Sequence, residues 1–110
     1  IRRAGINVFF PIEFRYTAAD DSWLSPFAGR DGASISVHQY YKQDYLPLFK
    51  LVEPIFWKYQ GRPHWGKLHT LTAKNLRVLY PHFDDFLRIR RQLDPQGRFL
   101  NPHAQALFLG

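Results

Sequence analysis

The chain has 110 residues, the length of one domain, and with 45% hydrophobic and 22% charged residues its composition is that of a folded globular protein. The absence of cysteine excludes a disulfide scaffold, a thiolate nucleophile and a cysteine-ligated metal site. The net charge of +6 favours anionic partners, but the 15 basic residues are spread along the whole chain, which disfavours a nucleic-acid interface.

The first predicted element is a β-strand over residues 6–17. From Ile12 onward apolar and polar residues alternate strictly, so Glu13 and Arg15 fall on one face of the strand. Pro11 has no N–H to donate to a neighbouring strand, and we expect a sheet edge or a bulge at this point.

A loop and a second strand follow. Residues 18–32 are rich in Asp, Ser, Gly and Pro, which predicts a loop, although Trp23 makes it more apolar than a simple solvated turn. The second strand is predicted over residues 33–41. Its polar face carries Ser36 and His38.

A long helix is predicted next. Asp44 is a typical N-cap, Pro47 falls in the first turn, where proline loses no helical hydrogen bond, and Gly61 closes the segment. Pro54 lies in the middle of this run and is expected to kink or split the helix, at a cost of about 3 kcal/mol if nothing compensates. The predicted apolar stripe consists of Tyr45, Phe49, Val52, Phe56 and Tyr59.

Two shorter helices and an apolar tail complete the chain. Thr72 is expected to cap a helix that ends by Tyr80, and a third helix is predicted over residues 83–93. Residues 94–97 have the composition of a turn, and the tail over 98–110 needs other residues to cover it. Strands followed by helices indicate an α+β fold in which helices cover one face of an antiparallel sheet.

The polar face of the predicted sheet is the first candidate site. It carries Glu13, Arg15, Ser36 and His38, and we expect a polar ligand or a further domain to lie there. From spacing alone, an ordinary exposed ion pair explains Glu13 and Arg15 equally well. His38 could act as a general base, contact a ligand or be an ordinary surface histidine.

The segment after the long helix is the second candidate, because His64, Lys67 and His69 lie close together in it. Two histidines can bind a metal ion, but a lysine between them and no neighbouring carboxylate argue against a metal site, and we expect none. The sequence also lacks a glycine-rich phosphate loop, so we do not expect a nucleotide-binding site built by this chain alone.

Five blocks, in fixed order and spacing, form a longer pattern. They are Ile12-Glu13-Phe14-Arg15, Asp20-Asp21-Ser22-Trp23-Leu24-Ser25-Pro26, Arg62-Pro63-His64-Trp65-Gly66-Lys67, Tyr80-Pro81 and Asp94-Pro95-Gln96-Gly97-Arg98-Phe99-Leu100-Asn101. This pattern resembles the C-terminal part of the sugar-1,4-lactone oxidases, of the D-arabinono-, L-gulono- and L-galactono-lactone types, and of the related alditol oxidases. Both groups are flavoenzymes of the vanillyl-alcohol oxidase superfamily. The resemblance covers nearly the whole chain, from about Pro11 to Asn101.

The resemblance implies that two domains contribute different parts of the active site. In such enzymes an N-terminal domain holds FAD, often linked to a histidine, and a C-terminal cap domain supplies the substrate side of the active site. Residues 1–110 would be the C-terminal portion of this cap, without the FAD-binding domain. The first residue, Ile1 instead of Met, agrees with a segment of a longer protein. The apolar tail and the many aromatic residues would then pack against domains that this chain does not contain.

The resemblance also implies roles for four residues. The expected reaction transfers a hydride from a carbinol carbon to FAD, with O2 as the final acceptor, and it needs a proton acceptor and cations near the reacting atoms. Glu13 and Lys67 would bind or orient substrate hydroxyls, Arg15 would lie near the flavin, and His38 would be a base or hydrogen-bond partner. Which of His38 and Lys67 accepts the proton stays open, as does the choice between a sugar lactone and a polyol.

Two other functions remain as alternatives. One is a basic module that binds a polyanion through its aromatic and basic residues; the other is a structural fragment that only docks onto a partner. The sequence contains no candidate transmembrane segment. A cytoplasmic location is expected, with membrane association as an alternative, and an exposed apolar face could make a dimer.

Overall fold

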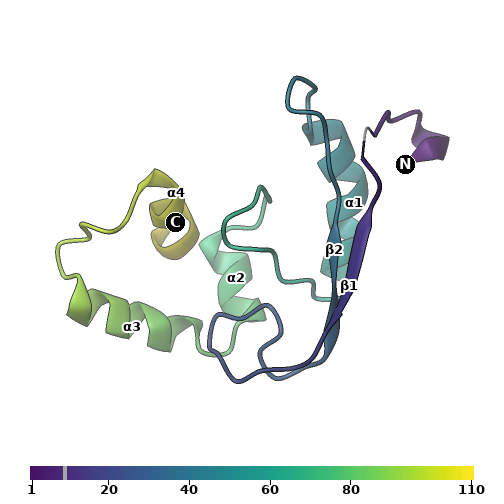
Figure 1. The fold of residues 1–110 in the computed structure, drawn as a ribbon. Coiled ribbons are helices and arrows are strands. Elements are labelled where there is room, and N and C mark those ends of the chain that lie inside the picture. Colours follow the sequence, from purple (N-terminus) through teal and green to yellow (C-terminus); the bar gives the residue numbers. More distant parts are fainter. Residues whose placement is uncertain (9) are drawn as a thin grey trace.

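The computed structural model describes residues 1–8 and 10–110 (Figure 1). Over these residues the chain forms one 3₁₀ helix, a two-stranded antiparallel sheet and four α-helices. The α+β fold class predicted from the sequence is confirmed. The bounds are Arg2–Ala4 for the 3₁₀ helix, Glu13–Thr17 for β1, Gly32–Ser36 for β2, Leu46–Lys58 for α1, Ala73–Leu79 for α2, Phe83–Leu93 for α3 and Pro102–Leu109 for α4.

Both strands are shorter than predicted. β1 begins at Glu13, two residues after Pro11, which cannot donate to a strand ladder. β2 ends at Ser36, and the predicted continuation to residue 41 forms no strand. Phe9, which belongs to the predicted first strand, lies outside the described residues.

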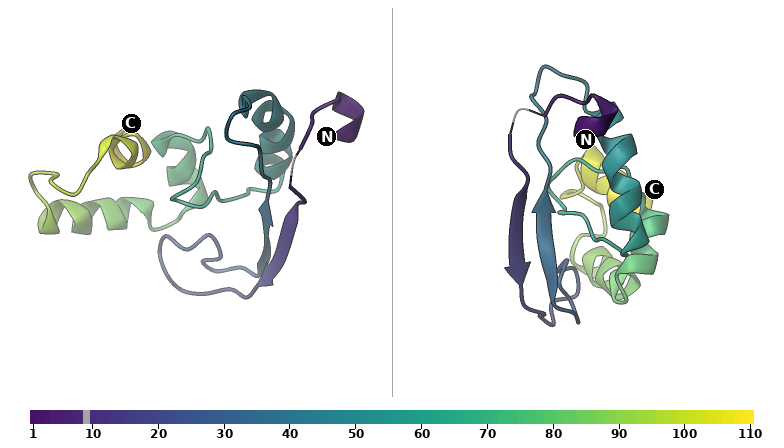
Figure 2. Two further views of the ribbon diagram at one scale, coloured as in Figure 1. Left: turned by 45° about the horizontal axis from the view of Figure 1, so that its top comes forward. Right: turned by 90° about the vertical axis from the view of Figure 1, so that its right-hand side faces the viewer.

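The two faces of the β1–β2 hairpin differ in polarity. Glu13 pairs with Ser36 and Arg15 pairs with Ser34, so these four residues share one polar face. The helices lie to one side of the hairpin (Figure 2), and we expected them to cover the apolar face. The side chains of that face are exposed instead. They are Ile12, Phe14, Tyr16 and Ile35.

The hydrophobic core lies away from the sheet, between α2, α3 and α4 (Figure 1). Tyr80, which follows α2, and Phe83, which begins α3, are both fully buried. Apolar burial is concentrated here, which explains why the hairpin keeps an exposed apolar face. The buried cluster is Leu76, Tyr80, Phe83, Leu87 and Leu107, packed by Leu24, Trp65, Leu71, Leu79, Phe86 and Phe108.

α2 and α3 begin and end as predicted, because their boundaries are set by local signals. The Asn75 carboxamide oxygen accepts hydrogen bonds from the backbone N–H and the hydroxyl of Thr72, at 3.0 and 2.9 Å. Pro81 follows directly after α2 ends, and α3 ends at the turn over residues 94–97.

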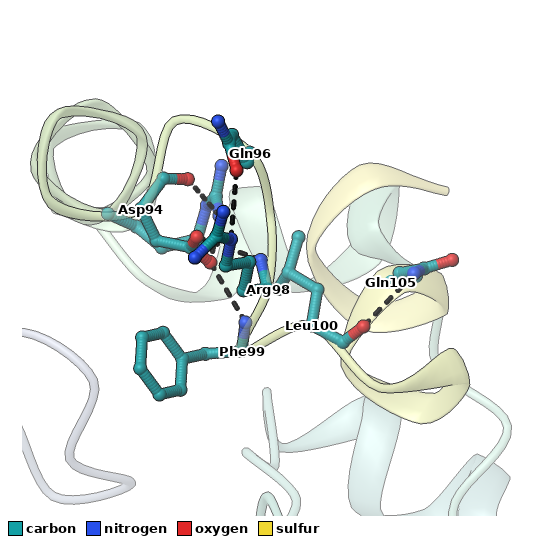
Figure 3. Close-up of polar contacts among 7 residues, drawn as sticks. Asp94, Gln96, Arg98, Phe99, Leu100 and Gln105 are labelled. Atoms are coloured by element: carbon teal, nitrogen blue, oxygen red, sulfur yellow. Dashed lines mark hydrogen bonds and ion pairs between the residues drawn. The ribbon is translucent and has the colours of Figure 1, made fainter.

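Asp94 organises the turn after α3 (Figure 3). Its carboxylate accepts hydrogen bonds from the backbone N–H groups of Arg98, at 2.8 Å, and Phe99, at 3.1 Å, and it faces Arg90. Burial alone would raise the pKa of Asp94, but these N–H groups and the charge of Arg90 hold it below its ordinary value. Gly97, with φ +67°, supplies the left-handed residue that the turn requires.

α4 was missed by the sequence-based prediction, which assigned only an apolar tail there. The Asn101 side chain accepts a hydrogen bond from the N–H of Ala104 at 2.8 Å, and Pro102 occupies the first turn. Leu107 and the half-buried Phe108 join the core. The tail is therefore partly covered, although Phe99 remains 88% exposed.

Of the two outcomes expected for Pro54, a kink or a split of the long helix, the split is wrong, because α1 continues through Pro54 as one helix. Pro54 is exposed, so the Lys50 carbonyl that it leaves without a helical donor can bind water. The N-cap is Tyr45 and not Asp44, whose carboxylate instead accepts a hydrogen bond from the Leu46 N–H at 2.9 Å. Val52 is buried as predicted, but Tyr59 of the predicted stripe is exposed.

The molecule is extended and has a large surface. It measures 48 × 31 × 19 Å, with a radius of gyration of 15.7 Å, whereas a compact chain of this length has about 13 Å. The accessible surface is 8435 Å², compared with about 6,300 Å² for a compact monomer of this mass. Within the described residues, no helix is long and apolar enough to cross a membrane.

Candidate active site

Glu13 and Arg15 form the centre of the candidate site. They lie two residues apart on β1, and an Arg15 guanidinium nitrogen donates to the Glu13 carboxylate at 3.0 Å. The Arg15 side chain is 72% exposed and that of Glu13 48%. An ion pair this exposed contributes only about 0–1 kcal/mol, so either group can turn towards a ligand at little cost.

His38 lies two residues beyond the end of β2 and is half-buried. Its imidazole ring lies 6.1 Å from the ring of Phe10, centroid to centroid. The hairpin register continued beyond the strand would bring His38 opposite Pro11, next to Glu13.

Lys67 lies in the segment between α1 and α2 and is exposed. The segment turns tightly at this point, because the Lys67 N–H donates to the His64 carbonyl and the Gly66 N–H donates to His64 Nδ1, both at 3.0 Å. No contact recorded for the described residues joins the Lys67 side chain to Glu13, Arg15 or His38. The structure therefore pairs two of the four predicted site residues, places His38 just beyond the end of β2, and places Lys67 on a separate segment between α1 and α2.

The candidate site is an open surface. The cavities formed by the described residues include two of similar volume. One, of about 320 Å³, lies at the end of the hairpin and includes Tyr16 and Asp31; the other, of about 360 Å³, lies between α3 and α4. None of Glu13, Arg15, His38 and Lys67 lines either cavity.

His69 does not join a metal centre. It is partly buried beside Glu53, and the Glu53 carboxylate is occupied by Thr70, whose N–H donates to it at 2.8 Å. Among the residues that the structure describes, no group of three or more His, Asp and Glu side chains is arranged to hold a metal ion.

The segment before Lys67 contains a half-buried arginine, Arg62, whose importance was not predicted from the sequence. Arg62 lies over the Tyr80 ring, 5.0 Å from its centroid, and donates to three backbone carbonyls. The signal that could have found it is a charged residue next to Pro63 in a segment rich in aromatic residues. Burial raises the pKa of Tyr80 to about 12, against the opposing charges of Arg62 and Arg30, so the Tyr80 phenol stays protonated and is no candidate base.

The four predicted residues carry the kinds of groups that part of a flavin site would need. Arg15 and Lys67 supply two cations, Glu13 a hydrogen-bond acceptor and His38 an imidazole, which suits the reacting edge of a flavin and a hydroxylated substrate. The same chain offers no glycine-rich loop for the phosphates of FAD. These residues could therefore complete a flavin site but not hold the whole cofactor.

Comparison with known proteins gives one consistent result. The family model described as D-arabinono-1,4-lactone oxidase matches residues 1–107. An L-gulono-1,4-lactone dehydrogenase of Mycobacterium tuberculosis is 47% identical over 96% of this chain and 24% of its own length. The L-gulonolactone oxidase of Mus musculus is 40% identical over 90% of this chain and 23% of its own length. An alditol oxidase of a Streptomyces species is 38% identical over 100% of this chain and 27% of its own length.

The chain thus spans about a quarter of the length of these curated relatives. Two of the three are named for an L-gulonolactone substrate and one for alditols, and the names include both oxidases and a dehydrogenase.

Proposed function

The chain belongs to the D-arabinono-1,4-lactone oxidase family, and from this premise we propose that it is the C-terminal portion of the substrate-binding cap domain of an FAD-dependent oxidase. The proposed enzyme transfers a hydride from a sugar-1,4-lactone of the D-arabinono-1,4-lactone type to FAD, with O2 as the final acceptor. An N-terminal FAD domain of the same protein would hold most of the cofactor. Residues 1–110 alone are expected to be inactive.

The observation that carries this proposal is the polar face of the β1–β2 hairpin. An exposed arginine and carboxylate are paired there on an otherwise open surface. An active site needs walls that exclude water, and the side chains of Arg15 and Glu13 are 72% and 48% exposed. The large exposed surface of the molecule supports the proposal that a second domain covers the site and closes it.

The four residues have complementary tasks in the proposed reaction. FAD, when bound, supplies the hydride acceptor. Glu13 and Lys67 bind and orient the substrate hydroxyls, and Arg15 stabilises negative charge that develops near the flavin. His38 or Lys67 accepts the proton of the substrate hydroxyl as the hydride leaves the carbon that carries this hydroxyl. Separation of the exposed Glu13–Arg15 pair would free both groups for these contacts.

A polyol is the second candidate substrate, because a relative that covers the full length of this chain is named an alditol oxidase. The choice between O2 and another electron acceptor belongs to the same test, since one relative is named a dehydrogenase. A cytoplasmic protein, either free or bound to a membrane surface, remains the expectation for location.

The test uses the full-length protein that contains residues 1–110, purified and examined for bound flavin. Anaerobic addition of D-arabinono-1,4-lactone, L-gulono-1,4-lactone or xylitol should bleach the flavin absorption, and readmitted O2 should restore it. Lys67→Ala or Arg15→Ala should lower kcat by about 100-fold or more, since each removes a group placed at the reacting atoms.

Lys74→Ala and Arg91→Ala are the matched controls. Both residues are exposed basic side chains on α2 and α3, and their variants should keep kcat within about twofold. A protein that takes up no flavin would contradict the proposal and favour the binding-module alternative. Equal loss in the control variants would show that the four residues have no special role.

A further inference from the structure

The backbone carbonyls that Arg62 binds belong to two distant parts of the chain. Its guanidinium donates to Ala28 O at 2.8 Å and more weakly to Pro26 O at 3.4 Å, both in the loop that joins β1 to β2. Its Nε donates to Leu79 O, at the end of α2, at 2.9 Å. A planar guanidinium with fixed donor directions can hold two backbone segments at once, which a lysine ammonium cannot reproduce.

Trp65 makes a second connection between its own segment and the β1–β2 loop. Its indole N–H donates to the Leu24 carbonyl in the β1–β2 loop at 2.7 Å, and its ring lies 5.0 Å from the Tyr80 ring. The Trp65 carbonyl in turn lies 3.1 Å from His103 Nε2 of α4. Arg30, in the β1–β2 loop, makes a third connection by donating to the carbonyl of Gln60, which lies directly before the segment with Arg62 and Trp65.

These contacts join the segment that carries Lys67 to the loop that connects the two strands of the proposed site. The β1–β2 loop over residues 18–31 connects the strand with Glu13 and Arg15 to the strand that leads to His38. The segment over residues 61–72 carries Lys67, only two residues after Trp65. Lys67 itself has no side-chain contact that could fix its position among the described residues.

We propose that Arg62 and Trp65 are positioning residues, which hold the 61–72 segment on the β1–β2 loop and thereby set where Lys67 stands relative to the Glu13–Arg15 face. This inference rests on the proposed function. A positioning role suits Arg62 because its Nε and one of its two terminal nitrogens already donate to backbone carbonyls of two distant segments. Burial, followed by the charge of Arg30, lowers its pKa from the ordinary value. It lines neither cavity.

The experiment compares Arg62→Lys and Trp65→Phe in the full-length flavin-loaded protein. Arg62→Lys keeps the charge but loses the forked donor geometry, and Trp65→Phe keeps a ring but loses the N–H. Each should lower kcat per bound flavin by about 10- to 100-fold, because displacement of a reacting group by about 1 Å has an effect of this size. Flavin content should not change.

Two matched controls separate this role from general damage. Arg77 also lies over an aromatic ring, 5.6 Å from the Phe83 centroid, but its hydrogen bond goes to Asp84 and not to either loop. Trp57 is a half-exposed tryptophan of α1. Arg77→Lys and Trp57→Phe should keep kcat within about twofold.

A double variant tests whether Arg62 acts through Lys67. When the Lys67 side chain is absent its position no longer matters, so Arg62→Lys should cause no further loss of kcat in a Lys67→Ala background. A loss of the same factor in both backgrounds would overturn the proposal, because Arg62 would then act elsewhere. Unchanged kcat in both Arg62→Lys and Trp65→Phe would overturn it as well.

Hydrogen exchange gives a readout that does not depend on activity. Arg62→Lys should speed amide exchange in residues 18–31 and 61–72 together, while α3 keeps its protection. Faster exchange confined to residues 61–72 would show that the two segments are not held together and would contradict the proposal. An inactive wild-type protein would defeat the proposed function separately, whatever the exchange result.

Discussion

The surroundings of His69 disfavour its charged form. It lies between Glu53 of α1 and His103 of α4, and both of its ring nitrogens are buried. Burial lowers the pKa of His69 below its ordinary value of 6.5; the Glu53 carboxylate opposes this shift and His103 adds to it. The folded protein therefore keeps His69 neutral at a pH where the unfolded chain already binds a proton.

This difference makes stability depend on pH. Because the pKa of His69 is lower in the folded state than in the unfolded state, the unfolded state binds more protons below about pH 6.5, and the free energy of unfolding falls as the pH falls. Thermal unfolding between about pH 7.5 and 5.5 should show a falling Tm, with a smaller slope in His69→Leu.

Val78→Thr is the control for this measurement, since Val78 is exposed on α2 and the change removes no ionisable group. Its slope should match that of the wild type. Equal slopes in His69→Leu and the wild type would show that other groups cause the pH dependence.

Single residues also show how far the sequence could define the site. Strict alternation along β1 correctly put Glu13 and Arg15 on one face, because strand geometry has a period of two. The importance of Arg62 and the burial of His69 depend on contacts with residues 16 to 36 positions away, which no local pattern encodes.

At the scale of elements, α1 carries an interior proline without being interrupted. Proline at this position removes one hydrogen bond, and its ring crowds the carbonyl of Lys50. The helix persists because Leu48 and Val52 bury its inner face while Pro54 points to solvent.

Pro54→Ala should therefore stabilise the protein. Alanine restores the lost N–H and removes the crowding, and the gain in free energy of unfolding should be about 1–3 kcal/mol, measured by denaturant titration. Pro47→Ala is the control, since Pro47 lies in the first turn, where no helical hydrogen bond is missing; it should bring no such gain. An unchanged or lower stability in Pro54→Ala would mean that the proline is not strained here.

Elements with local boundary signals were predicted accurately, and those that depend on the rest of the fold were not. Thr72, Pro81 and the 94–97 turn fixed the bounds of α2 and α3. The strands were predicted too long, because β-prone residues continue beyond the pairing that a two-stranded hairpin supports. α4 was not predicted although Asn101-Pro102 is a helix-start signal, because the apolar residues of the tail show little helical periodicity.

At the scale of the whole molecule, about 2,000 Å² of surface beyond that of a compact monomer is exposed. Part of it is the apolar face of the hairpin, where Phe14 and Tyr16 pack edge to face, 4.9 Å apart, with most of their surface in solvent. Apolar patches of this kind are typical of interfaces.

Residues 1–110 on their own are therefore expected to self-associate through this face. Gel filtration over a range of concentrations should show a shift towards twice the monomer mass, and Phe14→Glu should reduce it. Val78→Glu is the control, because Val78 is an exposed apolar residue on α2, away from the hairpin. A clean monomer at high concentration would contradict the prediction.

The core of the molecule is built from aromatic rings and branched aliphatic side chains, and the sequence contains neither methionine nor cysteine. The proposed oxidase would pass two electrons to O2 and so release hydrogen peroxide from a site in the same protein. Thioethers and thiols are the side chains that peroxide oxidises most readily, and sulfoxide formation in a core disrupts its packing. A core without sulfur would keep its packing when the enzyme produces hydrogen peroxide, because it contains no thioether or thiol to oxidise.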